Sequence, residues 1–93
     1  MKKFADWNEE KNQWLKQNRG ISYEEVLIAM DDNQVLDVVD NESHPGQKIM
    51  VINFNNYAYA IPYVENESKI FFKTIYPSRK YTKVYLEGKD NDE

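Results

Sequence analysis

Residues 22–30 carry the clearest helical pattern in the chain, and this helix is the firmest element that the sequence predicts. Ser22 followed by Glu25 forms a capping box, in which each side chain accepts a hydrogen bond from a backbone N–H at the helix start. The apolar residues behind the cap follow the i, i+3, i+4, i+7 spacing of one helical face: Tyr23, Val26, Leu27 and Met30. We therefore predict a helix that begins after Ser22 and ends at residues 31–33.

Another helix is predicted just before it, from Asp6 to Gly20. Asp6 lies three residues before Glu9, which is a variant of the capping box, and Gly20 suits the left-handed conformation that ends a helix. Lys11 lies one turn from each tryptophan, as a snorkelling side chain or a cation–π partner. The residues that share one face at this spacing, and that we expect in the core, are Trp7, Trp14 and Leu15.

The rest of the chain has the pattern of strands. Four runs are rich in β-branched and aromatic residues and are separated by turn signals, at residues 34–39, 48–54, 57–64 and 69–76. Asn55-Asn56 suits a tight hairpin turn, and Pro62 marks an edge, a bulge or a strand end. Residues 78–86 fit either a short helix capped by Ser78 or an extended segment.

These elements predict one α+β domain over residues 1–86, with two N-terminal helices packed on an antiparallel sheet of about four strands and a short C-terminal segment. Residues 87–93 form an acidic tail that we expect to be disordered. There is no cysteine, no apolar run long enough to span a bilayer and no apolar stretch typical of a signal peptide near the start. We therefore expect a cytoplasmic protein that does not bind membranes.

The net charge of −4 argues against a nucleic-acid ligand until its distribution is considered. The formal charge is +2 over residues 1–20, −7 over 21–47, +4 over 48–86 and −3 over 87–93. An acidic middle and an acidic tail thus hide two basic segments, and a sheet with one basic face is compatible with the sequence.

Most sequence motifs of enzymes are missing, which leaves few kinds of chemistry. The chain has no P-loop, no dinucleotide-binding glycine pattern, no serine or cysteine triad and no zinc-protease motif. Four acidic residues near the predicted first strand lack the spacing and glycine of a calcium loop: Asp31, Asp32, Asp37 and Asp40. We therefore predict no metal and no cofactor, and we interpret the acids as a solvated edge that could dock a basic partner.

The basic segments offer the remaining option, because cations and tyrosines are interleaved in them. Metal-free RNA cleavage uses the ribose 2′-OH as nucleophile, so the protein supplies a proton acceptor, a proton donor and cations for the charged phosphorane. Cations also hold phosphates, and tyrosines can stack on bases. Before any family resemblance is considered, the same composition is more typical of a plain solvated or half-buried sheet face. The residues concerned are His44, Lys48, Lys73, Arg79, Lys80 and Lys83, with Tyr57, Tyr59, Tyr63, Tyr76 and Tyr81 among them.

The order of motifs resembles the BrnT-type toxin family over about residues 4–86. The helical pair contains Phe4-x-Asp6-Trp7-Asn8-x-x-Lys11 and then Asn18-Arg19-Gly20-Ile21-Ser22-Tyr23-x-Glu25-Val26. This is similar to the family pattern F-x-W-(D/N)-x-x-K followed by K-H-G-(V/I)-(S/T)-F-E-E-A. The segment Ile75-Tyr76-Pro77-Ser78-Arg79-Lys80-Tyr81-Thr82-Lys83 looks like the family ending I-S-A-R-(R/K)-A-T-(R/K).

The resemblance implies a bacterial toxin with a RelE-like fold, a metal-independent endoribonuclease that stops translation. It also implies a cognate antitoxin, often a ribbon-helix-helix protein that blocks the toxin and represses the operon, so that DNA is contacted only through the antitoxin. Lys11, Arg79 and Lys83 match cations of the family pattern. Arg19 stands in place of the family histidine, where it can bind phosphate but cannot move a proton at neutral pH.

Three interpretations follow. The first is an active ribonuclease toxin, the second is a degenerate toxin-fold module that acts only through antitoxin binding and operon control, and the third is an unrelated domain that binds a small ligand or a protein. A homodimer is compatible with each of them. For the first, we assign catalysis to Arg79, Lys83, His44 and Tyr76, and RNA phosphate binding to Lys11, Arg19, Lys48, Lys73 and Lys80.

Overall fold

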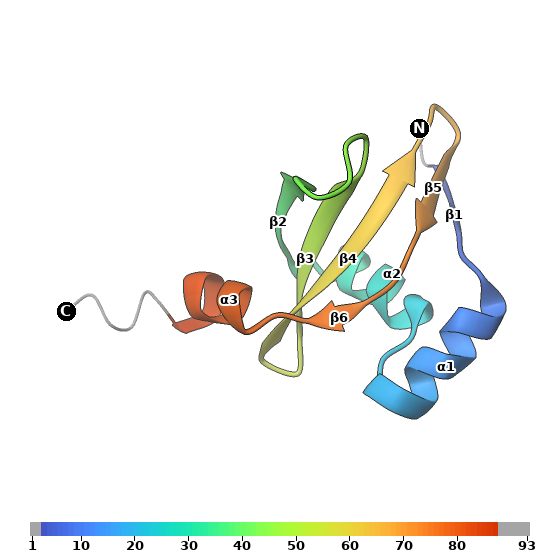
Figure 1. Ribbon diagram of the computed structural model, residues 1–93. Coiled ribbons are helices and arrows are strands. Elements are labelled where there is room, and N and C mark those ends of the chain that lie inside the picture. The colour runs from blue at the N-terminus through green and yellow to red at the C-terminus, as the bar shows by residue number, and fades with distance from the viewer. Residues whose placement is uncertain (1–2, 88–93) are drawn as a thin grey trace.

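A computed structural model describes residues 3–87 and shows a mixed α/β fold in three layers (Figure 1). The described residues form a six-stranded sheet with α1 and α2 on one face and α3 on the other. The sheet path is β1-β5-β4-β3-β2, and β6 also pairs with β4. The predicted tail lies outside the described residues except for Glu87. No helix in the described part of the chain is long and apolar enough to cross a membrane.

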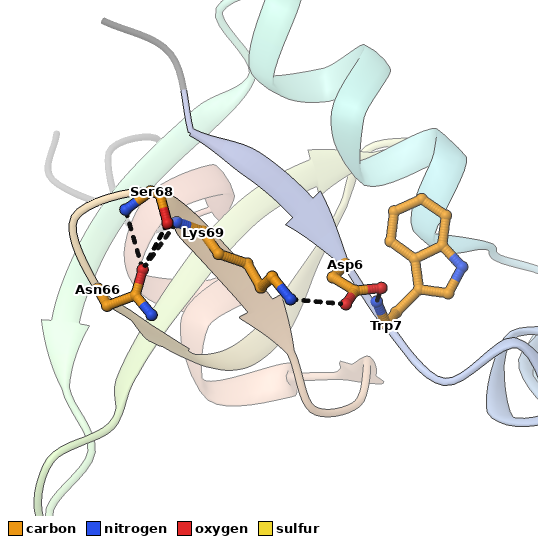
Figure 2. A network of polar contacts seen from close by, with 5 residues as sticks. All are labelled: Asp6, Trp7, Asn66, Ser68 and Lys69. Carbon is orange, nitrogen blue, oxygen red and sulfur yellow. Dashed lines mark hydrogen bonds and ion pairs between the residues drawn. The ribbon is translucent and has the colours of Figure 1, made fainter.

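The first element is a strand and not the start of a helix, which corrects the predicted layout of helices followed by an antiparallel sheet of about four strands. Strand β1 (Phe4–Asp6) pairs in parallel with β5 (Lys69–Phe72). The Asp6 carboxylate accepts from the Trp7 N–H at 2.8 Å and pairs with the Lys69 ammonium at 3.4 Å, as Figure 2 shows. In the adjoining turn, the Asn66 side-chain oxygen accepts from the backbone N–H groups of Ser68 and Lys69 (Figure 2).

Helix α1 (Glu9–Arg19) therefore begins later than predicted, with Asn8 as its cap. The Asn8 side chain accepts from the Lys11 N–H at 3.1 Å. Trp7 precedes the helix and stacks on Tyr23 at a centroid distance of 5.3 Å, so its packing against the core is confirmed. Trp14 is 42% exposed, so its prediction as a core residue is wrong, because the face shared with Trp7 exists only if the helix starts at Asp6.

Helix α2 (Tyr23–Asp31) has the capping box that the sequence predicts, with Ser22 and Glu25 bonded to each other's backbone. Gly20, with φ of 68°, ends α1 in the left-handed region, which glycine adopts readily. The two helices are joined by the fully buried side chain of Asn12. Its oxygen accepts from the Tyr23 N–H at 2.8 Å, and its amide donates to the Glu24 carboxylate at 2.9 Å.

The central strands follow the prediction closely. They are β2 (Val35–Asp40), β3 (Lys48–Phe54) and β4 (Tyr57–Glu65), and all pairings among them are antiparallel. Asn55 and Asn56 both have positive φ, 55° and 63°, as a tight hairpin between β3 and β4 requires. The two faces of β3 alternate strictly: Met50 and Ile52 pack toward α1 and α2, whereas Ile49 and Val51 pack toward the C-terminal helix.

The last predicted strand is divided in two. Strand β5 ends at Phe72 and pairs with the C-terminal end of β4. Strand β6 (Tyr76–Pro77) pairs nearer the start of β4, and the buried Ile75 lies between the two strands in sequence. Pro62 lies in β4 opposite Ile49, and its carbonyl accepts from the Lys73 N–H at 2.8 Å. In an antiparallel strand the N–H and C=O of one residue face the same neighbouring strand. The Pro62 nitrogen therefore faces the break between β5 and β6, where no ladder hydrogen bond is lost.

The ambiguous C-terminal segment is helical. Ser78 caps α3 (Arg79–Thr82) by accepting from the Tyr81 N–H, and the chain continues as the π-helical turn η1 (Lys83–Glu87). The buried Thr82 hydroxyl accepts from the Ala58 N–H at 2.9 Å and donates to the Ser78 carbonyl at 2.8 Å. The Tyr85 hydroxyl donates to Asp37 of β2. The C-terminal helical segment is therefore bonded to β4 through Thr82 and to β2 through Tyr85.

Candidate functional site

One hollow brings together three of the predicted site residues from separate parts of the chain. It has a volume of about 370 Å³ and lies between the β2–β3 loop and the segment that joins β5 to β6. His44 comes from the loop, Lys73 comes from the joining segment, and Tyr76 is the first residue of β6. The remaining lining residues are polar or small: Asn41, Ser43, Gln47, Pro62 and Thr74. We refer to this feature as the His44 hollow.

Backbone hydrogen bonds fold the loop that carries His44. The His44 N–H donates to the Asn41 carbonyl at 3.2 Å, and the Gln47 N–H donates to the His44 carbonyl at 3.1 Å. The Asn41 side chain also accepts from the Ser43 N–H at 3.1 Å. Gly46 has φ of 90°, which lets the loop turn back into β3. The imidazole is thus exposed on a loop whose path is fixed by its own backbone.

Tyr76 and Lys73 form the opposite wall. Burial raises the pKa of the Tyr76 hydroxyl, and the neighbouring Tyr81 raises it further. The phenol is therefore protonated at neutral pH and can donate a proton or a hydrogen bond. Lys73 is exposed, and its ammonium lies 5.5 Å from the centre of the Phe71 ring. The hollow thus combines a titratable imidazole, a neutral phenol and an ammonium group.

Arg79, Lys80 and Lys83 lie just beyond the hollow in sequence, on α3 and η1. All three side chains are exposed, and none of them forms an ion pair with another described residue. None of them lines the His44 hollow. They form a separate group of cations on α3 and η1. These helical turns pack on the face of the sheet that carries Ala58 and Ala60.

The other three predicted phosphate ligands are engaged elsewhere. Lys48 pairs with Asp40 at 3.1 Å, and this hydrogen-bonded ion pair raises the pKa of the lysine. Arg19 donates to the carbonyl of Ile75, so it fixes the backbone of the segment that lines the hollow. The Lys11 ammonium lies 4.5 Å from the centre of the Trp14 ring, which is the cation–π arrangement, one of the two alternatives predicted for this side chain.

Sequence reasoning missed Asn41, Ser43, Gln47 and Thr74 as lining residues. The only signal for Asn41 and Ser43 was that they lie in the polar stretch 40–46 between two predicted strands, which indicates a loop but not its closeness to Lys73. A second hollow of about 330 Å³ lies between α2 and the β3–β4 turn. It is lined by the carboxylates of Glu25 and Asp32 and by no Lys, Arg or His, so it does not suit a phosphate.

Within residues 3–87, no three His, Asp or Glu side chains are grouped so that they could hold a metal ion. The His44 hollow itself is lined by an imidazole, an ammonium group and a phenol. No family model, curated protein or solved structure matches this chain at a significant level.

Proposed function

We propose that this protein is the ribonuclease toxin of a type II toxin–antitoxin pair, with a RelE-like fold, and that it cleaves RNA at the His44 hollow and so inhibits translation. The observation that carries the proposal is the convergence of His44, Lys73 and Tyr76 on one hollow. The resemblance of the helical pair and of residues 75–83 to the BrnT-type family adds independent support. The antitoxin would be a ribbon-helix-helix protein that binds operator DNA for the complex.

The three side chains supply the parts that metal-free RNA cleavage needs. The His44 imidazole takes the proton of the ribose 2′-OH, and the resulting oxygen attacks the adjacent phosphorus. Lys73 neutralises the charge that builds on the phosphorane oxygens. The Tyr76 phenol gives its proton to the 5′-oxygen as the P–O bond breaks, because an alkoxide is more basic than a phenolate. The products are a 2′,3′-cyclic phosphate and a 5′-OH end.

The cations of α3 and η1 have a different role in this proposal. Arg79, Lys80 and Lys83 are exposed and lie a few residues after Tyr76, and we expect them to hold phosphates on one side of the scissile bond. Neutralising one of them should weaken RNA binding more than it slows the bound complex. Loss of His44 should instead slow the chemical step at saturating RNA.

The test is a cleavage assay on single-stranded RNA in the presence of EDTA. His44→Ala and Lys73→Ala should each reduce the rate at saturating RNA by about 10²-fold or more, a typical contribution of a general base or of a charge-stabilising group. Lys69→Gln is the matched control, because it removes a lysine of the neighbouring strand that pairs with Asp6 outside the hollow. Equal activity of wild type, His44→Ala and Lys73→Ala would refute the assignment.

A degenerate toxin-fold module is the second candidate, and Arg19 favours it. An arginine stays charged at any pH a cell reaches, and its guanidinium here is bonded to the Ile75 carbonyl, so it holds structure in place of moving protons. This candidate predicts tight antitoxin binding and no RNA cleavage. Induction in a bacterial host separates the two: growth arrest that needs His44 supports the toxin, whereas unimpaired growth at high expression supports the module.

A further inference from the structure

The outer face of α1 carries an indole between two cations. Trp14 is 42% exposed. The Lys11 ammonium lies 4.5 Å and the Arg19 guanidinium carbon 5.0 Å from the centre of its ring. Phe4 is more exposed, at 79%, yet no cation of the described chain lies over its ring. We call the group Lys11, Trp14 and Arg19 the Trp14 surface.

The charge around this surface is one-sided. Residues 11–23 contain Lys11, Lys16 and Arg19 and no aspartate or glutamate, in a chain whose net charge is −4. The acids of α1 itself, Glu9 and Glu10, are confined to its first turn. A ligand that covers the indole from the C-terminal half of α1 thus meets cations and neutral amides. This charge pattern favours an anionic ligand with flat rings.

Arg19 links the Trp14 surface to the His44 hollow. Its guanidinium contacts Trp14 and also donates to the carbonyl of Ile75. Thr74 and Tyr76, the neighbours of Ile75, both line the hollow. The two features therefore share the segment that joins β5 to β6, with Arg19 bound to its backbone from the α1 side.

We propose that Trp14 is a stacking platform for one base of single-stranded RNA, with Lys11 and Arg19 holding the flanking phosphates. This inference rests on the proposed function in one respect, namely that the bound RNA is also the substrate that the His44 hollow cleaves. It names that substrate as unpaired, because an indole can cover a base only where the base is not stacked in a duplex. An acidic peptide would use the two cations but would gain nothing from the flat ring between them.

The experiment measures binding without cleavage. The probe is a 12-nucleotide oligouridine in which every 2′-OH is methylated, so that the nucleophile of the proposed reaction is blocked. Binding should quench tryptophan emission and raise the anisotropy of a labelled probe. Trp14→Ala should weaken binding by about 10-fold, within the range of one base–aromatic stack, and Trp14→Phe should retain most of the affinity. Phe4→Ala is the matched control, since it removes an exposed aromatic ring over which no described cation lies, and should leave binding unchanged.

Salt dependence gives a second readout that does not depend on the indole. Each phosphate contact on a single strand contributes about 0.7 to the slope of log K against log salt concentration, so Lys11→Gln should lower this slope by about that amount. Lys69→Gln, a lysine substitution outside the surface, should not. Circular dichroism of each variant establishes that the fold is intact, and Trp14→Phe keeps the test valid if Trp14→Ala does not fold.

The outcomes separate this inference from the proposed function. If Trp14→Ala binds the oligouridine as tightly as wild type, the stacking platform is wrong, whether or not the protein cleaves RNA. If wild type cleaves no RNA but binds the probe through Trp14, the platform stands and the ribonuclease assignment falls. If poly-glutamate quenches Trp14 emission and the oligouridine does not, the surface docks an acidic protein and the inference is overturned. If cleavage does occur, Trp14→Ala should raise KM and leave kcat unchanged.

Discussion

Asn12 offers the sharpest test of how the two N-terminal helices are held together. Its side chain is fully buried and makes three hydrogen bonds: its oxygen accepts from the Tyr23 N–H at 2.8 Å, and its amide donates to the Glu24 carboxylate at 2.9 Å and to the Glu9 carboxylate at 3.5 Å. In Asn12→Ala the Tyr23 N–H loses its partner at a buried site, which costs about 1–3 kcal/mol. The lost bond to Glu24 adds about 1 kcal/mol or less, because that carboxylate is exposed and water can replace the amide.

The expected loss is therefore about 1–4 kcal/mol, a large fraction of the roughly 5–14 kcal/mol that a domain of this size has in total. Urea denaturation followed by circular dichroism measures it as a lower midpoint at unchanged slope. Gln17→Ala, an exposed amide on the same helix, is the control and should change stability by less than about 0.5 kcal/mol. A loss below about 1 kcal/mol for Asn12→Ala would refute the argument, because it would mean that the Tyr23 N–H finds another partner.

Titration of Glu24 gives the same test an independent readout. The hydrogen bond from Asn12 is the main reason that the pKa of Glu24 lies below its ordinary value of 4.5. A lowered carboxyl pKa contributes stability above the unfolded pKa, and this stability is lost as pH falls through the folded pKa. Asn12→Ala should therefore return the Glu24 pKa toward 4.5, as measured by NMR, and should differ less from wild type in stability below about pH 4.

Three further perturbations have defined outcomes. Thr82→Val should lower the free energy of unfolding in urea by about 1–3 kcal/mol, because the buried Ala58 N–H loses its acceptor. Tyr23→Phe should leave the free energy of unfolding unchanged or raise it slightly, because the buried Tyr23 hydroxyl has no partner among the described residues. Burial raises the pKa of this hydroxyl to about 12. The wild type should therefore lose stability as pH rises from 10 toward 12, whereas Tyr23→Phe should not. Tyr85→Phe should weaken the acid dependence below about pH 4, because the Tyr85 hydroxyl is the main group that lowers the pKa of Asp37, and that contribution is lost as pH falls through the folded pKa.

Local signals in the sequence predicted the elements that local interactions decide. The capping box at Ser22 and the paired asparagines at residues 55 and 56 both act within a few residues, and both occur as predicted. The start of α1 was mispredicted, because Asp6 is held by a partner 63 positions away in sequence, Lys69. A parallel pairing between the chain start and β5 leaves no local trace, and the misplaced helix start also put Trp14 on the wrong face.

The candidate site was predictable in its residue types and not in its grouping. His44, Lys73 and Tyr76 could be named from their chemistry, and they line one hollow because the last strand breaks between Phe72 and Tyr76. That break depends on Ile75 turning into the core and on Arg19 bonding to its carbonyl, which are tertiary effects. Lys11, Arg19 and Lys48 do not join the group, since they contact the Trp14 ring, the Ile75 carbonyl and Asp40 respectively.

The most direct test of the account is the end chemistry of RNA treated with the purified protein in EDTA. If the His44 hollow cleaves RNA, a single-stranded substrate is cut into fragments with 2′,3′-cyclic phosphate and 5′-OH ends. A substrate with one 2′-deoxynucleotide should resist cleavage at that position only, and the His44→Ala protein should yield no fragments above background. Intact RNA after incubation with wild type, or fragments whose yield is the same with His44→Ala, would contradict it.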